Sequence, residues 1–160
     1  LEATEEPYGL MDEILCSDGE GVKHLHQVAG GSVKPASHET VDAREHFIYQ
    51  EGQAVFKWAV VKMAEATETI LQRNDLTSED ISFLLPHQAN MRIIKATGSR
   101  LGLDEDKVLI NIEKYGNTTS ATIPMLMYEN QNRFKKGDNL ILTSFGAGFT
   151  WGAIWLKWAI

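Results

Sequence analysis

Three stretches of the chain have the pattern of helices. Over residues 51–73, apolar side chains recur at three- and four-residue steps, so one side of a helix faces a core. The apolar positions of this stretch are Val55, Ala59, Met63, Ala66 and Ile70. Residues 89–101 repeat the spacing and end at Gly102, a residue that commonly terminates helices. Residues 118–134 are the third predicted helix, with Pro124 close enough to its start to be tolerated.

Short apolar runs between these helices predict strands. They are residues 81–85, 108–112, 139–145 and 149–158. The last run is apolar on both faces, which is typical of a central strand. Strands alternate with helices until a glycine turn reverses the final pair, so we expect an α/β fold of order β-α-β-α-β-β. The sheet is predicted to be mixed and mostly parallel, with helices on both of its faces.

The chain divides into an expected core and an expected lead-in. Residues 51–160 carry all the helical and strand patterns, and we expect them to form the α/β core. Residues 1–50 are rich in turn-forming residues and are predicted to be irregular loops. The opening "LEAT" reads as the tail of a strand without a start methionine, which indicates a processed or cut chain.

Composition narrows the classes of function. The net charge of −7 argues against sequence-independent nucleic-acid binding, which needs a basic surface. No window approaches the ~20 consecutive apolar residues of a membrane span. The acidic, polar start resembles no secretory signal, and the single cysteine, Cys16, excludes an internal disulfide framework, so we expect a cytoplasmic protein. The "HLH" spacing at residues 24–26 is not a usual zinc pattern, and no metal site is predicted.

Polar or glycine-rich loops follow three of the predicted strands. "PHQAN" places His87 after the first, "YGN" places Asn117 after the second, and "FGAG" at residues 145–148 follows the third. The carboxyl ends of parallel strands meet at one edge of a sheet, where ligands bind. We therefore expect these three loops to converge.

The converging residue types suit the stabilisation of a negatively charged oxygen. A neutral His87 and the amide of Asn117 can both donate a hydrogen bond to one enolate oxygen, such as forms when a thioester-linked acid loses CO₂. Each residue also has a purely structural reading: His87 as a hydrogen-bonded helix residue, Asn117 as a helix cap and the glycines as a hairpin turn. These loops contain no nucleophile, since Cys16 lies in a polar turn far away in the sequence.

Three motifs resemble one family. "PHQANMRII", then "YGNTTSA", then "SFGAGFTWG" are similar, in this order and spacing, to the C-terminal half of β-ketoacyl–acyl-carrier-protein synthase III. The resemblance implies a thiolase-like fold and decarboxylating condensation of an acyl-CoA with malonyl-carrier protein, without a further cofactor. It implies a homodimer of the complete enzyme. It also implies a Cys-His-Asn triad, in which His87 and Asn117 match the last two members. The family's nucleophilic cysteine belongs to an N-terminal half that this chain lacks.

The resemblance assigns further residues to the substrate channel and to carrier docking. Those implied along the channel are Gly52, Phe56, Ala89 and Asn90. Phe145 matches the phenylalanine beside the nucleophile, and Gly146 begins the glycine loop near the acyl oxyanion. Gln88 and Arg92 match the segment that meets the carrier protein, and the resemblance places Lys57 nearby. Lys95 and Arg100 are expected to join them because they lie with Arg92 on one helix face. Independently of the family, residues 81–103 contain no acid in a chain of charge −7, so a basic face suits an acidic partner, although a solvated helix face is the ordinary reading.

Two other functions stay open at this point. The chain can be a non-catalytic half that binds a carrier protein, or part of a related thiolase-like acyltransferase. A serine or cysteine hydrolase is disfavoured, because the chain has no G-x-S-x-G motif.

Overall fold

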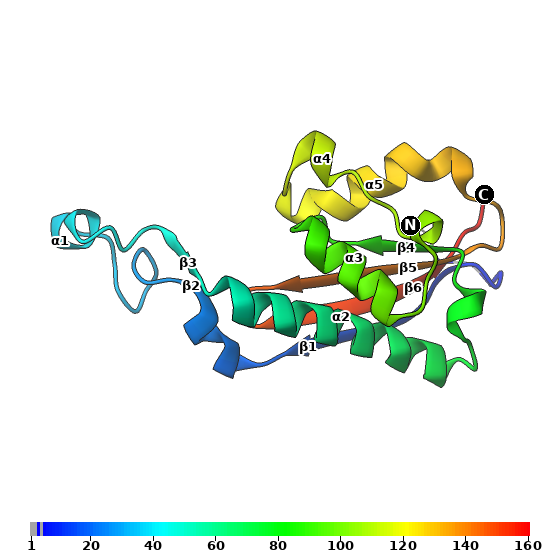
Figure 1. The fold of residues 1–160 in the computed structure, drawn as a ribbon, viewed down its shortest axis with the longest axis horizontal. Coiled ribbons are helices and arrows are strands. Elements are labelled where there is room, and N and C mark those ends of the chain that lie inside the picture. The colour runs from blue at the N-terminus through cyan, green and yellow to red at the C-terminus, as the bar shows by residue number, and fades with distance from the viewer. Residues whose placement is uncertain (1–2, 4) are drawn as a thin grey trace.

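The computed structural model describes residues 3 and 5–160, and its centre is a four-stranded sheet (Figure 1). The strands lie in the order β1-β6-β5-β4. Their bounds are Gly9–Ser17 for β1, Phe83–Pro86 for β4, Asn139–Gly146 for β5 and Thr150–Lys157 for β6. The strand tail expected in "LEAT" lies largely outside the described residues. As predicted, the last strand is central, since β6 has a neighbour on each side.

The expectation of a mostly parallel sheet is wrong. Of the four described strands in this sheet, β4 and β5 pair in parallel, while β6 pairs antiparallel with both β5 and β1. The tight turn after Gly146 returns the chain beside β5, and the reversed β6 then separates β5 from β1. Strand β1 runs in the same direction as β5, so the reversed β6 between them is antiparallel to both.

The expectation of an irregular lead-in is also wrong over β1. Eight of its residues pair with β6, with a register shift between Leu10 and Asp12 that leaves Met11 unpaired. As an edge strand, β1 leaves Leu10 and Leu15 exposed and carries charge within it, so its sequence shows no clean alternation. This segment forms a strand because its backbone pairs with the apolar strand β6 beside it.

The strand predicted at residues 108–112 is reduced to one parallel bridge between Val108 and Leu84. The side-chain oxygen of Gln88 accepts hydrogen bonds from the backbone N–H groups of Asn111, at 3.0 Å, and Ile112, at 3.1 Å. These donors are therefore unavailable to a longer ladder. The chain turns instead into the short helix α4 (Ile112–Tyr115).

The three predicted helices are present, and they cover both faces of the sheet. They are α2 (Gly52–Arg73), α3 (Met91–Arg100) and α5 (Thr122–Asn130), the last of which has 3-10 turns on either side. Ile141 of β5 packs in a core cluster with residues of α2 and α3, whereas its neighbour Leu140 packs with Leu126 of α5. Since consecutive strand residues point to opposite faces, α2 and α5 lie on opposite sides.

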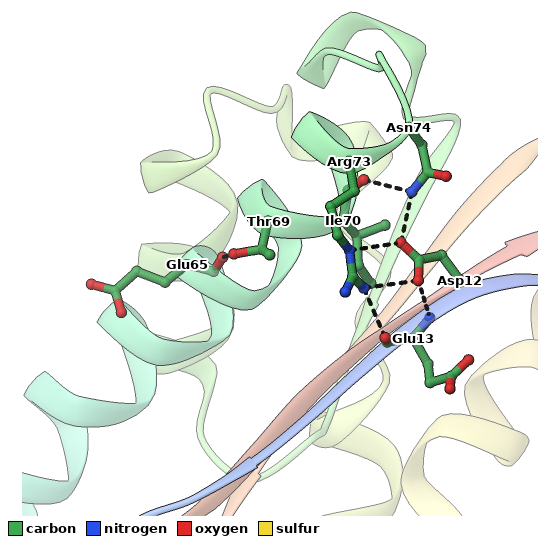
Figure 2. A network of polar contacts seen from close by, with 7 residues as sticks. All are labelled: Asp12, Glu13, Glu65, Thr69, Ile70, Arg73 and Asn74. Atoms are coloured by element: carbon green, nitrogen blue, oxygen red, sulfur yellow. Dashed lines mark hydrogen bonds and ion pairs between the residues drawn. The ribbon is translucent and has the colours of Figure 1, made fainter.

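A polar network ties the edge strand to the end of α2 (Figure 2). Two guanidinium nitrogens of Arg73 donate to the carboxylate of Asp12 at 3.1 and 2.8 Å, and Arg73 also donates to the carbonyl of Glu13. Asn74 donates to the same carboxylate at 2.7 Å. The network lies beside the register shift in β1 and fixes this strand end against the helix.

An arm projects from the body of the molecule between β1 and α2 (Figure 1). It contains η1 (Gly19–His24), the paired strands β2 (Leu25–Gln27) and β3 (Ile48–Gln50), and α1 (His38–Asp42). The other short 3-10 turns are η2 (Ser78–Asp80), η3 (Glu105–Lys107), η4 (Thr119–Ala121) and η5 (Gln131–Arg133). Among the described residues, no helix has the length and apolar character needed to cross a membrane.

Candidate active site

A cavity of about 820 Å³ lies beyond the carboxyl ends of β4 and β5. All eight residues predicted for catalysis or substrate binding line it. They are Gly52, Phe56, His87, Ala89, Asn90, Asn117, Phe145 and Gly146. The expected convergence of the loops is therefore confirmed. The loops converge although the sheet is mostly antiparallel, because β4 and β5, whose ends carry two of the loops, are parallel neighbours.

The backbone and one ring nitrogen of His87 are held by neighbouring groups. Its N–H donates to the carbonyl of Thr143 on β5 at 2.8 Å, so the backbone continues the parallel ladder past Pro86. Its Nδ1 lies 2.7 Å from Oγ1 of Thr122. Burial lowers the pKa of His87, so the ring is neutral near pH 7. The other nitrogen, Nε2, is left for a ligand in the cavity.

The amide of Asn117 is oriented by its own turn. Its Oδ1 accepts a hydrogen bond from the backbone N–H of Thr119 at 2.9 Å, in the manner of an Asx turn. Gly116 precedes it with a φ of 67°, a conformation that glycine adopts without steric cost. Since the oxygen is occupied, the NH₂ group of Asn117 is the part available to a ligand. Asn117 can therefore cap the turn with its side-chain oxygen and bind a ligand with its NH₂ group.

Gln88 is the one predicted docking residue that the structure excludes. Its side chain is 0% exposed. Its amide nitrogen donates to the carbonyls of Pro86, at 2.8 Å, and Leu109, at 3.3 Å, while its oxygen accepts the two bonds that end the Val108 bridge. A side chain buried and bonded in this way cannot contact a carrier protein, and its role is to join the His87 loop to the Asn111 loop.

The remaining docking candidates form an exposed basic face on two packed helices. Lys57 lies on α2, and Arg92, Lys95 and Arg100 lie on α3. Within the described part of the chain, none of these four cations lies within ion-pair distance of a carboxylate. The guanidinium of Arg92 stacks 5.3 Å from the centre of the Phe56 ring and also lines the cavity. The basic face therefore begins at the mouth of the site.

The start of α3 also shapes this mouth. The Asn90 side chain accepts a hydrogen bond from the N–H of Arg92 at 2.8 Å, which is the role of an N-cap. Asn90 is also one of the residues that line the cavity. Asn90 thus starts the helix and lines the cavity at once.

The arm supplies a wall of the cavity that the sequence reading missed. The arm residues that line it are Leu25, His26, Gln27, Ile48 and Gln50. Strands β2 and β3 have three residues each, too few to show a periodic pattern. The segments that form these strands, "LHQ" and "IYQ", are the only sequence features that could have indicated the wall. Their pairing joins residues more than twenty positions apart in the chain.

Cys16 does not line this cavity. It lies on β1 and borders a second hollow of about 530 Å³ on the sheet, together with Leu15, Ile123 and Ile154. The cavity that holds His87 and Asn117 is therefore without a cysteine among the described residues.

Comparison with known proteins identifies the family. The family described as "3-Oxoacyl-[acyl-carrier-protein (ACP)] synthase III C terminal" matches residues 71–158, more than half of the chain. The chain belongs to this family. The matched range contains His87, Asn117 and Phe145, so the resemblance carried by the three motifs is confirmed, and the fold is the α/β thiolase-like half that it implied.

Relatives of this synthase III C-terminal domain are about twice as long. The chain is 57% identical over 159 residues to a β-ketoacyl-[acyl-carrier-protein] synthase III of Porphyromonas gingivalis, covering 99% of this chain and 48% of the relative. A synthase III of Chlorobium phaeobacteroides is 55% identical, with 98% and 48% covered. The chain thus spans about half the length of the curated relatives it matches.

Solved structures show the same arrangement. A 3-oxoacyl-(acyl carrier protein) synthase III from Pseudomonas aeruginosa PAO1 superposes with a TM-score of 0.85 at 32% identity, covering 99% of this chain and 49% of that one. A synthase III from Thermus thermophilus gives a TM-score of 0.84 at 38% identity, with 98% and 48% covered. In each case the synthase III C-terminal domain corresponds to one half of the solved chain.

Proposed function

We propose that this chain is the C-terminal half of a β-ketoacyl–acyl-carrier-protein synthase III and stabilises the enolate formed from malonyl-carrier protein. One observation carries the proposal: His87 and Asn117 line a single cavity, and each has one nitrogen left free by the bond that its other polar atom makes. Two N–H donors aimed at one developing charge are what an oxyanion hole requires.

The reaction begins on a cysteine of the N-terminal half, which attacks the acyl-CoA and releases CoA. In the malonyl thioester, the bond between the carboxylate carbon and the α-carbon then breaks, and CO₂ leaves. The electron pair passes to the thioester, whose carbonyl oxygen becomes an enolate oxygen. His87 Nε2–H and the Asn117 NH₂ group donate to this oxygen, with no cofactor involved. The enolate carbon attacks the cysteine-bound acyl group, and the cysteine leaves as a thiolate.

The low pKa of His87 supports its part in this mechanism. A neutral imidazole binds the enolate as a hydrogen-bond donor and is a weaker acid than imidazolium, so it does not hand over a proton and quench the carbanion. Phe56 and Phe145 line the same cavity, and apolar surroundings favour a neutral ring by the same desolvation.

The missing half is proposed to pack on the open part of the sheet. The hollow that contains Cys16 is bordered by apolar side chains, and Leu15 within it is 79% exposed. Relatives about twice as long supply the further protein needed to cover such a surface. The complete enzyme is proposed to act as a homodimer of these two-half chains.

The carrier protein is proposed to dock on the basic face formed by Lys57, Arg92, Lys95 and Arg100. These side chains are exposed, lack carboxylate partners among the described residues and start at the cavity mouth. An acidic carrier would be steered toward them at low salt.

The decisive experiment joins this chain to its N-terminal half and measures decarboxylation of malonyl-carrier protein. His87→Ala is expected to lower the rate by about 10²–10³-fold, the usual effect of losing an oxyanion donor. His38→Ala, in the exposed α1 of the arm, is the matched control and should leave the rate unchanged. An unaltered rate in His87→Ala would refute the assigned role.

Carrier docking is tested separately by binding. Arg92→Glu should weaken binding of the carrier protein at low salt, because it reverses a charge at the cavity mouth. Lys135→Glu makes the same charge change just before the start of β5, at the far end from the cavity, and should have little effect. Salt-sensitive binding by the isolated chain without turnover would favour the non-catalytic alternative.

A further inference from the structure

Thr122 is buried directly behind the imidazole of His87. It is the first residue of α5 and is 2% exposed. Its Oγ1 lies 2.7 Å from Nδ1 of His87 and 3.0 Å from the carbonyl oxygen of Thr119. A hydroxyl group has one proton to donate, so it can donate to only one of these two neighbours.

The direction of the Thr122 hydroxyl hydrogen bond determines which nitrogen of a neutral His87 carries the ring proton. If Thr122 donates to Nδ1, the ring proton is on Nε2, and Nε2 is a donor toward the cavity. If Thr122 donates to Thr119, its oxygen accepts a bond from Nδ1–H, and Nε2 presents a lone pair to the cavity. Only the first arrangement can bind an enolate oxygen, because a lone pair repels it.

We infer that Thr122 donates its hydroxyl proton to His87 Nδ1 and so holds His87 as the tautomer that carries its proton on Nε2. The carbonyl of Thr119 already accepts the backbone N–H of Thr122, whereas Nδ1 has the hydroxyl as its hydrogen-bond partner in the described structure. The contact with Nδ1 is also the shorter of the two. Thr122 is therefore a positioning residue that acts through His87.

The functional part of this inference rests on the proposed function, but the tautomer can be measured without any reaction. Nitrogen NMR of the ¹⁵N-histidine-labelled chain identifies the protonated ring nitrogen at about pH 8, where a histidine of ordinary or lowered pKa is neutral. His87→Gln assigns the signals by their loss. We expect the proton on Nε2 and a hydrogen-bonded, unprotonated Nδ1. A proton on Nδ1 in the unaltered chain would overturn the inference.

Two substitutions at this position separate the hydroxyl from the shape of the side chain. Thr122→Ser keeps the hydroxyl and should preserve the His87 spectrum. Thr122→Val is nearly isosteric but cannot hydrogen-bond, so the Nδ1 signal should move to that of an unbonded nitrogen, with a second tautomer appearing. An unchanged His87 spectrum in Thr122→Val would contradict the inference. Thr97→Val, a buried threonine of α3 outside the cavity, should leave the His87 signals in place.

Activity gives the second readout. In the assembled enzyme, Thr122→Val should slow decarboxylation by at least about tenfold, and by no more than the roughly 10²–10³-fold cost of losing an oxyanion donor. Thr122→Ser should restore most of the rate. If His87→Ala has no effect on the rate, the proposed function fails while the tautomer result stands. If the proton is on Nδ1, the inference about Thr122 fails whatever His87→Ala does.

Discussion

The two faces of the sheet differ in how completely this chain covers them. On the α2 face, Leu84 and Ile141 are 0% exposed and Ala153 is 1% exposed. On the other face, α5 covers the β4 side, but Leu15 on β1 is 79% exposed beside the second hollow. The first face is fully covered by this chain, and the second is covered only in part. Stability and assembly should therefore respond to different substitutions.

The largest effect is expected from truncating the same residue type on the two faces. Leu84→Ala removes a fully buried side chain and should lower the free energy of unfolding by roughly 2–5 kcal/mol. Leu15→Ala, at 79% exposure, should change it by no more than about 0.5 kcal/mol. Urea denaturation of both variants measures the contrast. Similar losses in the two would mean that the faces are equally complete. Leu15→Ala should instead weaken association with the N-terminal half.

The next effect tests whether the α2-side core reaches the end of the sheet beside the cavity. A Cβ added at Gly21 would clash with the ring of Phe149, which is 0% exposed and packs with Phe145. Gly21→Ala should therefore lower the free energy of unfolding by about 1–3 kcal/mol. Gly19→Ala, where no atom lies within 4 Å, is the control and should be nearly neutral. Equal thermal stability of the two variants would contradict tight packing there.

A smaller effect, of opposite sign, is expected inside the core on the α2 face. The hydroxyl of Thr97 is buried without a hydrogen-bond partner in the described structure. Burying an unpaired polar group costs about 1–3 kcal/mol, so Thr97→Val should leave stability unchanged or raise it by about 1 kcal/mol. Thr67→Val is the comparison, because the Thr67 hydroxyl donates to the carbonyl of Met63. A clear loss of stability in Thr97→Val would show that the hydroxyl is paired in solution.

The smallest effect concerns the edge that borders the open face. Asp12→Ala removes the carboxylate that accepts hydrogen bonds from Arg73 and Asn74 (Figure 2). We expect the free energy of unfolding to fall by about 0.5–1 kcal/mol, because the Asp12–Arg73 pair is partly exposed. Arg73→Lys keeps the charge but loses the fork geometry, so it should give a smaller loss. Hydrogen exchange of the β1 amides measures the effect locally. Unchanged exchange in Asp12→Ala would mean that the pairing with β6 alone holds the strand.

Much of the site was predictable because its residues follow elements with strong local patterns. The apolar stripe of α2 and the buried run of β4 are visible in short windows, and the end of that run places His87, whereas Phe56 comes only from the family resemblance. The order of strands and helices then brings Asn117 and Phe145 to the same edge. These steps need only side-chain periodicity and the direction of parallel strands.

The missed features depend on contacts between distant parts of the chain. Gln88 is polar and follows a strand, yet it is buried because its amide bonds the backbone of residues 109–112. Strand β1 exists because β6 lies beside it. The arm wall forms only when β2 and β3 pair across the α1 segment. No window of local sequence contains these partners.

The sequence by itself determined the helices, the central position of β6 and the three loops that carry His87, Asn117 and the glycines. Periodicity, turn chemistry and the family motifs are local properties, and each is complete within a few tens of residues. The tertiary structure decided that two strand pairings are antiparallel, that Gln88 is buried and that Thr122 lies behind His87. It also decided which face of the sheet stays open. Such choices depend on hydrogen bonds and packing between segments far apart in the chain, and only the folded molecule brings those segments together.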